Sequence, residues 1–537
     1  MTADPHRPAV IIAATPTPNG DLHLGHLAGP YLAADVYARH LRMSGRPVVY
    51  TTCTDDSQSY VLTTARRQGV PPRRLAATAA TAIARSLDAV GISTAGLPPT
   101  GDTYRGTVLD FVGQLHAAGR FRQRRVRLPY ARHAGTYLYD GLLSGTCPTC
   151  LSDSSGGVCE ACGHPNTFDD LLDPRYSLDP DDPVEPRVAD VLVLPAEDYR
   201  GRLAEYYARH TPRWRPHARR LVNELLARPL PDIPVTVPGS WGIPAPFAQT
   251  PGQVLYPWIE AMPASIYSTW WSRSPRGATG GNVDAPWRAE TDTELVYFHG
   301  YDNVYHWGLV DLVLLLAHGD RYVLPAANVC NEFYELAGAK FSTSRDHLVH
   351  APEVLAEVPR DLLRFYLALT APEYQRSTFD RAALPSVTQT RLVEPWNRLS
   401  RALDRALDAS SMPARLPTDE AGRRRAAIVA DRFRTWYGLP EFSIRQAADT
   451  LSTHVDRLAR QAEVLTGDPT DTGGLVVQVR ALLAGAAPLL VDTAAAAAAS
   501  GWESGDATAP STTVAALRLP PLAGVRAAPQ DGRLPVR

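Results

Sequence analysis

Lysine is almost absent from this chain of 537 residues, whereas arginine is abundant. The only lysine is Lys340, in the segment GAKFSTSR at residues 338–345. A chain that uses arginine as its general cation has reason to keep one lysine where a compact ammonium on a flexible stem is needed. Such a group can follow a moving phosphate, and the neighbouring hydroxyls can donate to phosphate oxygens. The alternative is a chance surface lysine in a polar loop.

The sequence also lacks a long apolar run and an excess of either charge. The apolar stretch at residues 309–317 is too short to span a bilayer, and no signal-peptide pattern stands at the N-terminus. We therefore expect a cytoplasmic protein without a membrane segment. The net charge is −2, so no global basic field would attract nucleic acid. Any RNA contact would depend on a local patch such as residues 213–220.

Cysteine is scarce, and four of the six cysteines form two CxxC pairs. Cys147 and Cys150 are separated by eight residues from Cys159 and Cys162. Four thiolates on two tight turns suit a closed tetrahedral Zn²⁺ site, which contributes to folding rather than to chemistry. Without signs of secretion, disulfides are not expected. The remaining two cysteines, Cys53 and Cys330, are predicted to lie in the core.

The first part of the chain predicts a strand, a turn and a helix in direct succession. An apolar run at residues 9–14 has strand length, and two prolines and a glycine end it. Asp21 can cap a helix that we expect over residues 22–42. The free N–H groups of such a helix form an anion site. His23 and His26 lie on one helical face and can donate to phosphate oxygens, although a surface pair without a role is the alternative.

Alternating strand and helix patterns continue along the chain, and a helical region follows residue 375. No internal repeat is present. We predict further strands at residues 47–53, 254–259, 294–302 and 322–328, and helices near residues 73–89, 104–118, 303–318, 392–407, 443–465 and 494–499.

HLGH at residues 23–26 and KFSTS at residues 340–344 resemble the HIGH and KMSKS motifs of class I aminoacyl-tRNA synthetases, most nearly those of the methionyl type. The resemblance extends from about residue 9 to about residue 375 and weakly to about residue 500. It implies an α/β fold, with a Rossmann-type catalytic domain, a zinc-knuckle insertion and a C-terminal α-helical bundle.

The resemblance also implies a domain plan. The expected parts are the first half of the catalytic domain (1–118), a connective insertion (119–235) with the zinc knuckle (145–165), the second half with the KMSKS-like loop (236–375), an α-helical bundle like the anticodon-binding one (376–500) and a tail that wraps the surface or is disordered (501–537).

In this family ATP and Mg²⁺ serve the reaction, and the resemblance implies a nucleotide site. His23, His26, Lys340 and Ser344 would be catalytic. Asp302, at the end of a predicted strand, would accept hydrogen bonds from the ribose hydroxyls. A helix cap is the alternative for this residue. The remaining residues expected around the nucleotide are Pro16, Asn19, Gly25, Gly300, Phe341, Ser342 and Thr343.

The resemblance further implies an amino-acid site, in which Asp56 holds the α-ammonium. A plain helix cap is the alternative for this residue. The expected side-chain pocket consists of Thr15, Thr17, Trp258, Ser265, Asn303 and Trp307. Five of these positions differ from the methionyl family, and hydroxyls and an amide replace most of its apolar walls. Buried unpaired polar groups would cost about 1–3 kcal/mol each against a thioether, which favours a polar or small amino acid. A slip of one residue in this comparison would account for one or two of the five.

Two further differences concern the phosphates and the tRNA. Thr343 stands where the family usually has a second lysine, and Arg345 could supply that cation. The family reads its anticodon with a Trp at the end of a helix that resembles residues 450–462. This chain has Arg460 and Gln461 there, so the apparatus for a methionine anticodon is predicted to be lost.

Three hypotheses follow. The first, which we favour, is an enzyme that forms an aminoacyl adenylate from an amino acid other than methionine and transfers the acyl group to a small molecule, with a possible partner enzyme in biosynthesis. The second is a divergent methionine–tRNA ligase, which would bind tRNA. The third is a non-catalytic paralogue that binds nucleotide or RNA. The sequence identifies neither the amino acid nor the acceptor, nor the oligomeric state.

Overall fold

A parallel sheet of four strands lies at the centre of the computed structural model, which describes residues 7–274, 282–341, 348–408, 412–503 and 512–526. The strand order is β15-β14-β1-β2. Ala9 lies opposite both Glu294 and Val48, so the carboxyl ends of these strands meet at one edge. The strands are β1 (Ala9–Ala13), β2 (Val48–Thr51), β14 (Glu294–Gly300) and β15 (Ala327–Asn331).

The sheet separates two hydrophobic cores. Along β1, Ile11 packs into the core that continues into the C-terminal helices, whereas Val10 and Ile12 pack into the core shared with the insertion. Side chains alternate between the faces of a strand, so a short run that is apolar at every position is buried on both sides. This arrangement confirms the predicted α/β fold of the Rossmann type.

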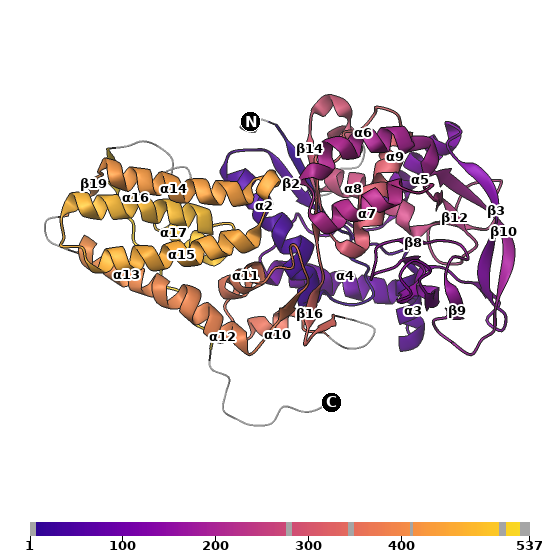
Figure 1. The fold of residues 1–537 in the computed structure, drawn as a ribbon, viewed down its shortest axis with the longest axis horizontal. Coiled ribbons are helices and arrows are strands. Elements are labelled where there is room, and N and C mark those ends of the chain that lie inside the picture. The colour runs from indigo at the N-terminus through magenta and orange to yellow at the C-terminus, as the bar shows by residue number, and fades with distance from the viewer. Residues whose placement is uncertain (1–6, 275–281, 342–347, 409–411, 504–511, 527–537) are drawn as a thin grey trace, which may run out of the picture.

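Helices cover both faces of the sheet (Figure 1). Two 3₁₀ or π segments, η1 (Leu27–Tyr31) and η7 (Tyr301–Asn303), follow the carboxyl ends of β1 and β14. The helices of this part are α1 (Leu24–His26), α2 (Leu32–Met43), α3 (Ser59–Gln68), α4 (Pro72–Ala89), α5 (Asp102–Ala117), α8 (Pro257–Arg273) and α9 (Asp311–Ala317).

The insertion between α5 and α8 is mostly antiparallel and lies at the end remote from the C-terminal helices (Figure 1). Its longest strands, β3 and β10, pair from Arg122 to Ala131. Its elements are β3 (Arg122–Ala131), β4 (Thr136–Tyr137), β5 (Leu143–Thr146), β6 (Asp153–Ser155), β7 (Gly157–Val158), β8 (Pro165–Asn166), β9 (Leu172–Tyr176), β10 (Val184–Pro195), α6 (Arg200–His210), α7 (Pro216–Leu226), β11 (Asp232–Pro234), β12 (Thr236–Val237) and β13 (Val254–Leu255).

The C-terminal part is helical, as the sequence predicts. Residues 512–526 of the expected tail lie against it, where Trp396 Nε1 donates to the carbonyl of Pro520 at 2.9 Å. The elements are β16 (Tyr334–Leu336), β17 (Ala339–Lys340), α10 (Ala351–Leu355), α11 (Arg360–Leu369), β18 (Ser377–Phe379), α12 (Ala383–Thr388), α13 (Glu394–Leu407), β19 (Arg415–Pro417), α14 (Glu420–Tyr437), α15 (Ile444–Glu463), α16 (Pro469–Ala486), α17 (Val491–Ala499) and β20 (Thr513–Ala515).

Proline explains three differences between the predicted and observed elements. The helix expected over residues 22–42 is interrupted at Gly29, whose backbone is not helical, because Pro30 has no N–H to donate. The strand expected over residues 254–259 stops at Leu255, and Pro257 begins α8 instead. The strand expected at residues 322–328 begins only at Ala327, after Pro325.

Two further expectations about the surface can be compared with the structure. Trp214, which the sequence places in a local basic patch, is buried and packs edge-on against Tyr207, so it is not available for stacking with a nucleotide. Among the described residues, no helix has the length and apolar character needed to cross a bilayer.

One buried ion pair connects the central domain to the C-terminal helices. Arg364 of α11 donates to Asp35 of α2 at 2.7 Å and to the carbonyls of Val90, Pro488 and Leu489. Both charged side chains are fully buried. Burial opposes ionisation of Asp35, but Arg364 and Arg39 outweigh it, and the pKa of Asp35 is lowered.

We predict that Asp35→Asn lowers the free energy of unfolding by about 3–5 kcal/mol, because Arg364 is left as an uncompensated buried charge. Urea denaturation at pH 7 measures this. Arg360→Gln, on the same helix, removes an exposed pair with Asp492 and should cost only about 0–1 kcal/mol. Since the pKa of Asp35 is lowered, its contribution is present above the pKa of the unfolded chain and decreases as the pH falls. Equal losses in the two variants would contradict the prediction.

Candidate active site

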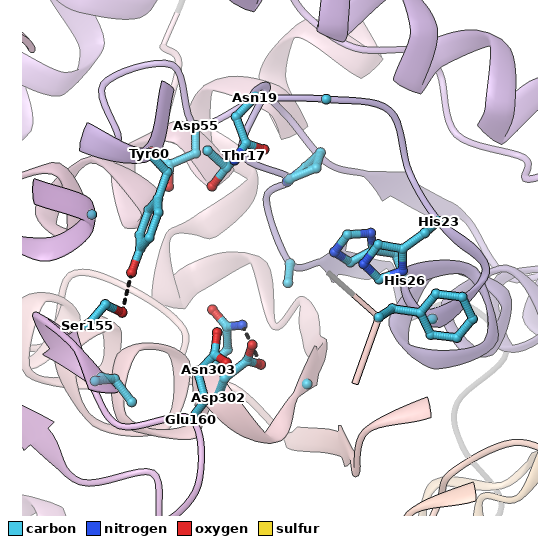
Figure 2. Close-up of a pocket in the computed structure, with 18 of the residues that line it drawn as sticks. Thr17, Asn19, His23, His26, Asp55, Tyr60, Ser155, Glu160, Asp302 and Asn303 are labelled. Carbon is cyan, nitrogen blue, oxygen red and sulfur yellow. Dashed lines mark hydrogen bonds between the residues drawn. The ribbon is translucent and has the colours of Figure 1, made fainter. Parts of the chain in front are cut away.

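A cavity with a volume of about 890 Å³ lies at the carboxyl edge of the sheet. Figure 2 shows His23 and His26 on one side of it and Tyr60 with Ser155 on the other. Open parallel sheets bind ligands at this edge. Of the residues predicted for the site, those that line the cavity are Thr15, Pro16, Thr17, Asn19, His23, Gly25, His26, Trp258, Gly300, Asp302, Asn303 and Phe341.

The two motifs meet through stacked rings. The ring centroids of His23 and His26 lie 3.8 Å apart. The ring of Phe341 stacks on His23, with 4.9 Å between the ring centroids. A Cβ atom at Gly25 would lie 2.9 Å from His23 Nδ1 and 3.1 Å from Phe341 Cδ2. Gly25 is therefore required for the contact between the motifs.

The start of the histidine helix is held by the chain that follows the lysine loop. Leu24 N–H donates to the carbonyl of Val349 at 3.0 Å, and His350 Nδ1 lies 3.1 Å from the carbonyl oxygen of Leu22. Asp21 is not the helix cap that the sequence predicts, because its Oδ1 accepts from the adjacent Leu22 N–H and His23 occupies the cap position.

The lysine loop itself is only partly described. The backbone of Lys340 pairs with Glu335 in the antiparallel ladder of β17 and β16. Ser342, Thr343, Ser344 and Arg345 lie outside the described residues.

The end of β14 brings a carboxylate into the cavity. Asp302 Oδ1 accepts from the side-chain amide of Asn303 at 3.0 Å. A Cβ atom at Gly300 would lie 2.7 Å from the same oxygen. The absence of a side chain at Gly300 thus allows the Asp302 carboxylate to lie against the end of the strand.

The carboxylate in the cavity beside β2 belongs to Asp55 rather than to Asp56. Asp55 is buried and lines the cavity. Asp56 does not line the cavity; its Oδ2 accepts from Thr100 at 2.6 Å, and its Oδ1 is buried without a hydrogen-bond partner among the described residues. The sequence resemblance alone pointed to the second carboxylate of this pair.

Ser265 and Trp307 also lie away from the cavity. Ser265 is buried within α8, where its hydroxyl donates to the carbonyl of Ala261 at 2.9 Å. Trp307 is buried and meets Tyr297 edge-on at 4.9 Å. A serine in a helix can satisfy its hydroxyl on the preceding turn, so its presence does not imply a polar pocket. Trp258 does line the cavity, and its ring stacks on His306 at 3.5 Å.

Three buried carboxyl groups lie near the end of β2, and one of them, Asp55, lines the cavity. Burial raises the pKa of Asp55 to about 8 and that of Asp140 to about 7. Glu260, which accepts from Tyr104 at 3.3 Å, also has a pKa raised by burial to about 8. A cation that entered next to Asp55 would favour its ionised form. This end of the cavity is therefore suited to an ammonium group.

The four cysteines of the CxxC pairs form one cluster in the insertion. Their sulfur atoms all lie within 4.8 Å of one another, with 3.8 Å between Cys147 and Cys162 and 3.6 Å between Cys150 and Cys159. A tetrahedron with Zn–S bonds of 2.3 Å has S–S edges of about 3.8 Å, so the cluster fits zinc. The other two cysteines, Cys53 and Cys330, are buried in the core, as predicted.

The two cysteine turns repeat the same backbone pattern. The carbonyl of Cys147 accepts from Leu151 N–H, and the carbonyl of Cys159 accepts from Gly163 N–H. In each turn the donor lies four residues after the cysteine. Both of these donors have positive φ, 62° at Leu151 and 75° at Gly163. Glu160, between the second pair of cysteines, lines the cavity, so the metal site also shapes one wall of the candidate active site.

The sequence reasoning missed several residues of this wall. On α3, the signal was a polar stripe, with Tyr60, Thr64 and Arg67 spaced four and three residues apart. On the insertion, Ser144 and Arg175 gave no local signal, because only the folding of the insertion against α3 brings them to the cavity.

Comparison with known proteins identifies the relatives of this chain. A family model described as tRNA synthetases class I (M) matches residues 9–403. The methionine–tRNA ligase of Christiangramia forsetii is 33% identical over 386 residues, which cover 71% of this chain and 55% of that protein. The methionine–tRNA ligase of Porphyromonas gingivalis is 31% identical over 446 residues, covering 82% and 64%. The chain thus spans between about half and two thirds of the length of these relatives.

The fold has solved counterparts. Methionyl-tRNA synthetase of Mycobacterium tuberculosis bound by methionyl-adenylate aligns with a TM-score of 0.72 and 17% identity, over 96% of this chain and 99% of that one. Its free state aligns with a TM-score of 0.70 and 17% identity, over 98% and 99%. At this identity the likeness concerns the fold, including the C-terminal helices.

The zinc site yields a prediction that metal analysis can check. Freshly purified protein should contain about one zinc per chain, because the four thiolates form a complete coordination shell. Cys159→Ser should lose most of this zinc and melt at a lower temperature, whereas Cys53→Ala should keep it. The absence of zinc from the unaltered protein, or equal zinc content in both variants, would refute the assignment.

Proposed function

Because this chain belongs to the tRNA synthetases class I (M) family, we propose that it activates an amino acid with ATP. The observation that carries this proposal is the stack of Phe341 on His23, which joins the two signature motifs at one edge of the cavity. In this reaction a carboxylate oxygen attacks the α-phosphorus of ATP, an acyl–phosphate bond forms, and pyrophosphate leaves. The products are an aminoacyl adenylate and pyrophosphate, and no bond to the enzyme is formed.

The residues at the nucleotide end have roles that fit this chemistry. The imidazoles of His23 and His26 and the ammonium of Lys340 would stabilise charge that develops on the phosphates. Asp302 would accept the ribose hydroxyls. Mg²⁺ would enter with the ATP and would supply positive charge that neutralises part of the charge of the phosphates. We keep Ser342, Thr343 and Ser344 as proposed phosphate contacts on the sequence resemblance alone.

For the amino acid, we propose that Asp55 receives the α-ammonium, in place of Asp56. The support is the position of Asp55 on the cavity wall and the engagement of Asp56 by Thr100 outside the cavity. Burial raises the pKa of Asp55 to about 8, and an ammonium from the substrate would favour its ionised form. Thr15, Thr17 and Asn303 remain as polar side chains around the substrate side chain, and they favour a polar or small amino acid.

Two candidates for the complete reaction remain. In the first, the acyl group passes to a small molecule in specialised metabolism, with a partner biosynthetic enzyme. Arg460 on α15 supports it, because the position of the expected stacking aromatic carries an arginine paired with Asp456. In the second, the chain is a methionine–tRNA ligase. The names of its relatives support that reading equally well. A non-catalytic paralogue is the least economical reading, because both motifs line one cavity.

We also retain the domain plan drawn from the resemblance as a proposal. Its boundaries follow residues 118, 235, 375 and 500. A cytoplasmic location is proposed on the same grounds.

Pyrophosphate exchange across all common amino acids tests the proposed function. We expect exchange with a polar or small amino acid and little with methionine. Lys340→Ala should lower the exchange rate by about 10²-fold, the typical loss for one preorganised charge-stabilising donor. Arg376→Ala, which removes a cation paired with Glu335 outside the cavity, is the matched control.

The same assay separates the candidates when total tRNA is added. AMP release without charged tRNA supports the small-molecule acceptor. Preferred activation of methionine together with charged methionine tRNA would establish the second candidate. Absence of exchange with every amino acid would overturn amino-acid activation itself.

The choice between the two aspartates has its own test. Asp55→Asn should raise the KM for the amino acid by about tenfold or more while leaving the KM for ATP nearly unchanged, because only the ammonium loses its partner. Asp56→Asn, an equal change at the adjacent residue, should have a smaller effect.

The pH dependence follows from the pKa of about 8. Asp55 becomes ionised as the pH rises, so the KM for the amino acid should fall between pH 6.5 and 8.5 in the unaltered enzyme, and this trend should vanish in Asp55→Asn. A larger effect at Asp56 than at Asp55 would contradict our assignment.

A further inference from the structure

The cavity does not end at the amino-acid site. It continues between α3 and the three-stranded sheet β6-β5-β9 of the insertion. We call this part the outer lobe and define it by Tyr60, Thr64, Arg67, Ser144, Ser155 and Arg175. Figure 2 shows that Tyr60 and Ser155 stand across the cavity from the histidine pair, with Asp302 and Asn303 at its lower side.

One wall of the outer lobe is a polar stripe on α3. Tyr60, Thr64 and Arg67 are four and three residues apart, so they project from one helical face. A Cβ atom at Gly141 would lie 2.8 Å from the ring of Tyr60. The tyrosine ring therefore packs directly on the backbone of the insertion, and its hydroxyl reaches Ser155 Oγ at 2.7 Å.

The opposite wall is one row of the insertion sheet. Ser144 of β5 lies opposite Ser155 of β6 on one side and opposite Arg175 of β9 on the other. Residues paired across neighbouring strands project from the same face of a sheet. Two hydroxyls and a guanidinium thus form a continuous polar row that faces α3.

Each wall contributes one guanidinium to the outer lobe. Arg67 donates through one nitrogen to the carbonyl of Ser177 at 3.0 Å. The carbonyl of Arg175 accepts from Ser144 Oγ at 3.4 Å, whereas its side chain is exposed and its guanidinium has no hydrogen-bond or ion-pair partner among the residues that the structure describes. Ser177 follows Arg175 by two residues, a separation of roughly 7 Å along an extended chain. Both arginines line the cavity, both are exposed, and most of their donors have no partner among the described residues.

We propose that the outer lobe binds the carboxylate of a small acceptor molecule whose nucleophilic nitrogen or oxygen attacks the aminoacyl adenylate. Paired guanidinium groups recognise a carboxylate through their planar forks. In the step, the nucleophile forms a bond to the acyl carbon and the bond from that carbon to the phosphate oxygen breaks. AMP leaves with the electron pair, and the proton of the nucleophile passes to water. This inference rests on the proposed formation of the adenylate.

The charges of the outer lobe favour a small molecule over an RNA end. Asp153 of β6 and Glu160 of the cysteine turn line the same side of the cavity. These carboxylates would repel the successive phosphates of a polynucleotide, whereas a single carboxylate can lie between Arg67 and Arg175. The hydroxyls of Thr64, Ser144 and Ser155 also suit a compact polar molecule.

Two probes with the same nucleophile test the proposal. Aminooxyacetate carries a carboxylate, and O-ethylhydroxylamine carries none. With ATP and the activated amino acid, the unaltered enzyme should transfer the acyl group to aminooxyacetate about tenfold faster or more, and with saturation. Arg67→Gln and Arg175→Gln should each lower this ratio toward one. Arg74→Gln, an exposed arginine on α4 outside the cavity, should leave the ratio at the value of the unaltered enzyme.

Equal rates with both probes in the unaltered enzyme, or a ratio that survives in both variants, would overturn the proposal. Charging of total tRNA that falls in Arg67→Gln and Arg175→Gln while the probe ratio does not would assign the outer lobe to RNA instead. Ligand-observed NMR with aminooxyacetate and no ATP provides a readout that does not depend on the proposed function. Even if no amino acid is activated, aminooxyacetate binding that Arg67→Gln and Arg175→Gln both lose would support the carboxylate site. Absence of aminooxyacetate binding to the unaltered enzyme would overturn the proposal.

Discussion

The hydrogen bonds of the buried Arg364 guanidinium fix the orientation of the C-terminal helices on the sheet. A buried guanidinium requires acceptors for its donors, and Asp35 and several backbone carbonyl groups supply them from separate parts of the chain. Asp35 lies on α2, which continues from the segment that carries His23 and His26. Any rotation of the C-terminal helices would break several of these bonds at once. The geometry of the histidine motif is therefore coupled to a region that does not contact the cavity.

A second constraint acts at the carboxyl edge of the sheet. Glycines at positions 25 and 300 leave room for a stacked ring and for a folded carboxylate, and any side chain there would collide with them. His23, Phe341 and Asp302 come from three distant parts of the chain, yet they line one cavity. The geometry of this end follows from the sheet, whose strands are mostly buried, whereas the insertion forms the other end from short strands and turns.

The sequence predicted the parts of the molecule that local patterns determine. The buried strands, the long helices, the cysteine cluster and the histidine pair each follow from spacing along the chain. It failed where an effect depends on the neighbours of a residue in space. The hydroxyl of Ser265 is satisfied by a carbonyl of its own helix and not by a ligand. Asp55 rather than Asp56 lines the cavity, and the Asp56 carboxylate accepts from Thr100. The polar wall formed by Ser144 and Arg175 depends on the packing of the insertion, which no local pattern encodes.

The cysteine cluster connects one wall of the cavity to the supply of metal. Ser155 and Glu160 belong to the segment that the cluster holds, while His23 and Asp302 are supported by the sheet. Loss of the metal would loosen the first wall and leave the second intact. The two ends of the cavity would therefore fail separately when zinc is scarce, the insertion side before the histidine side.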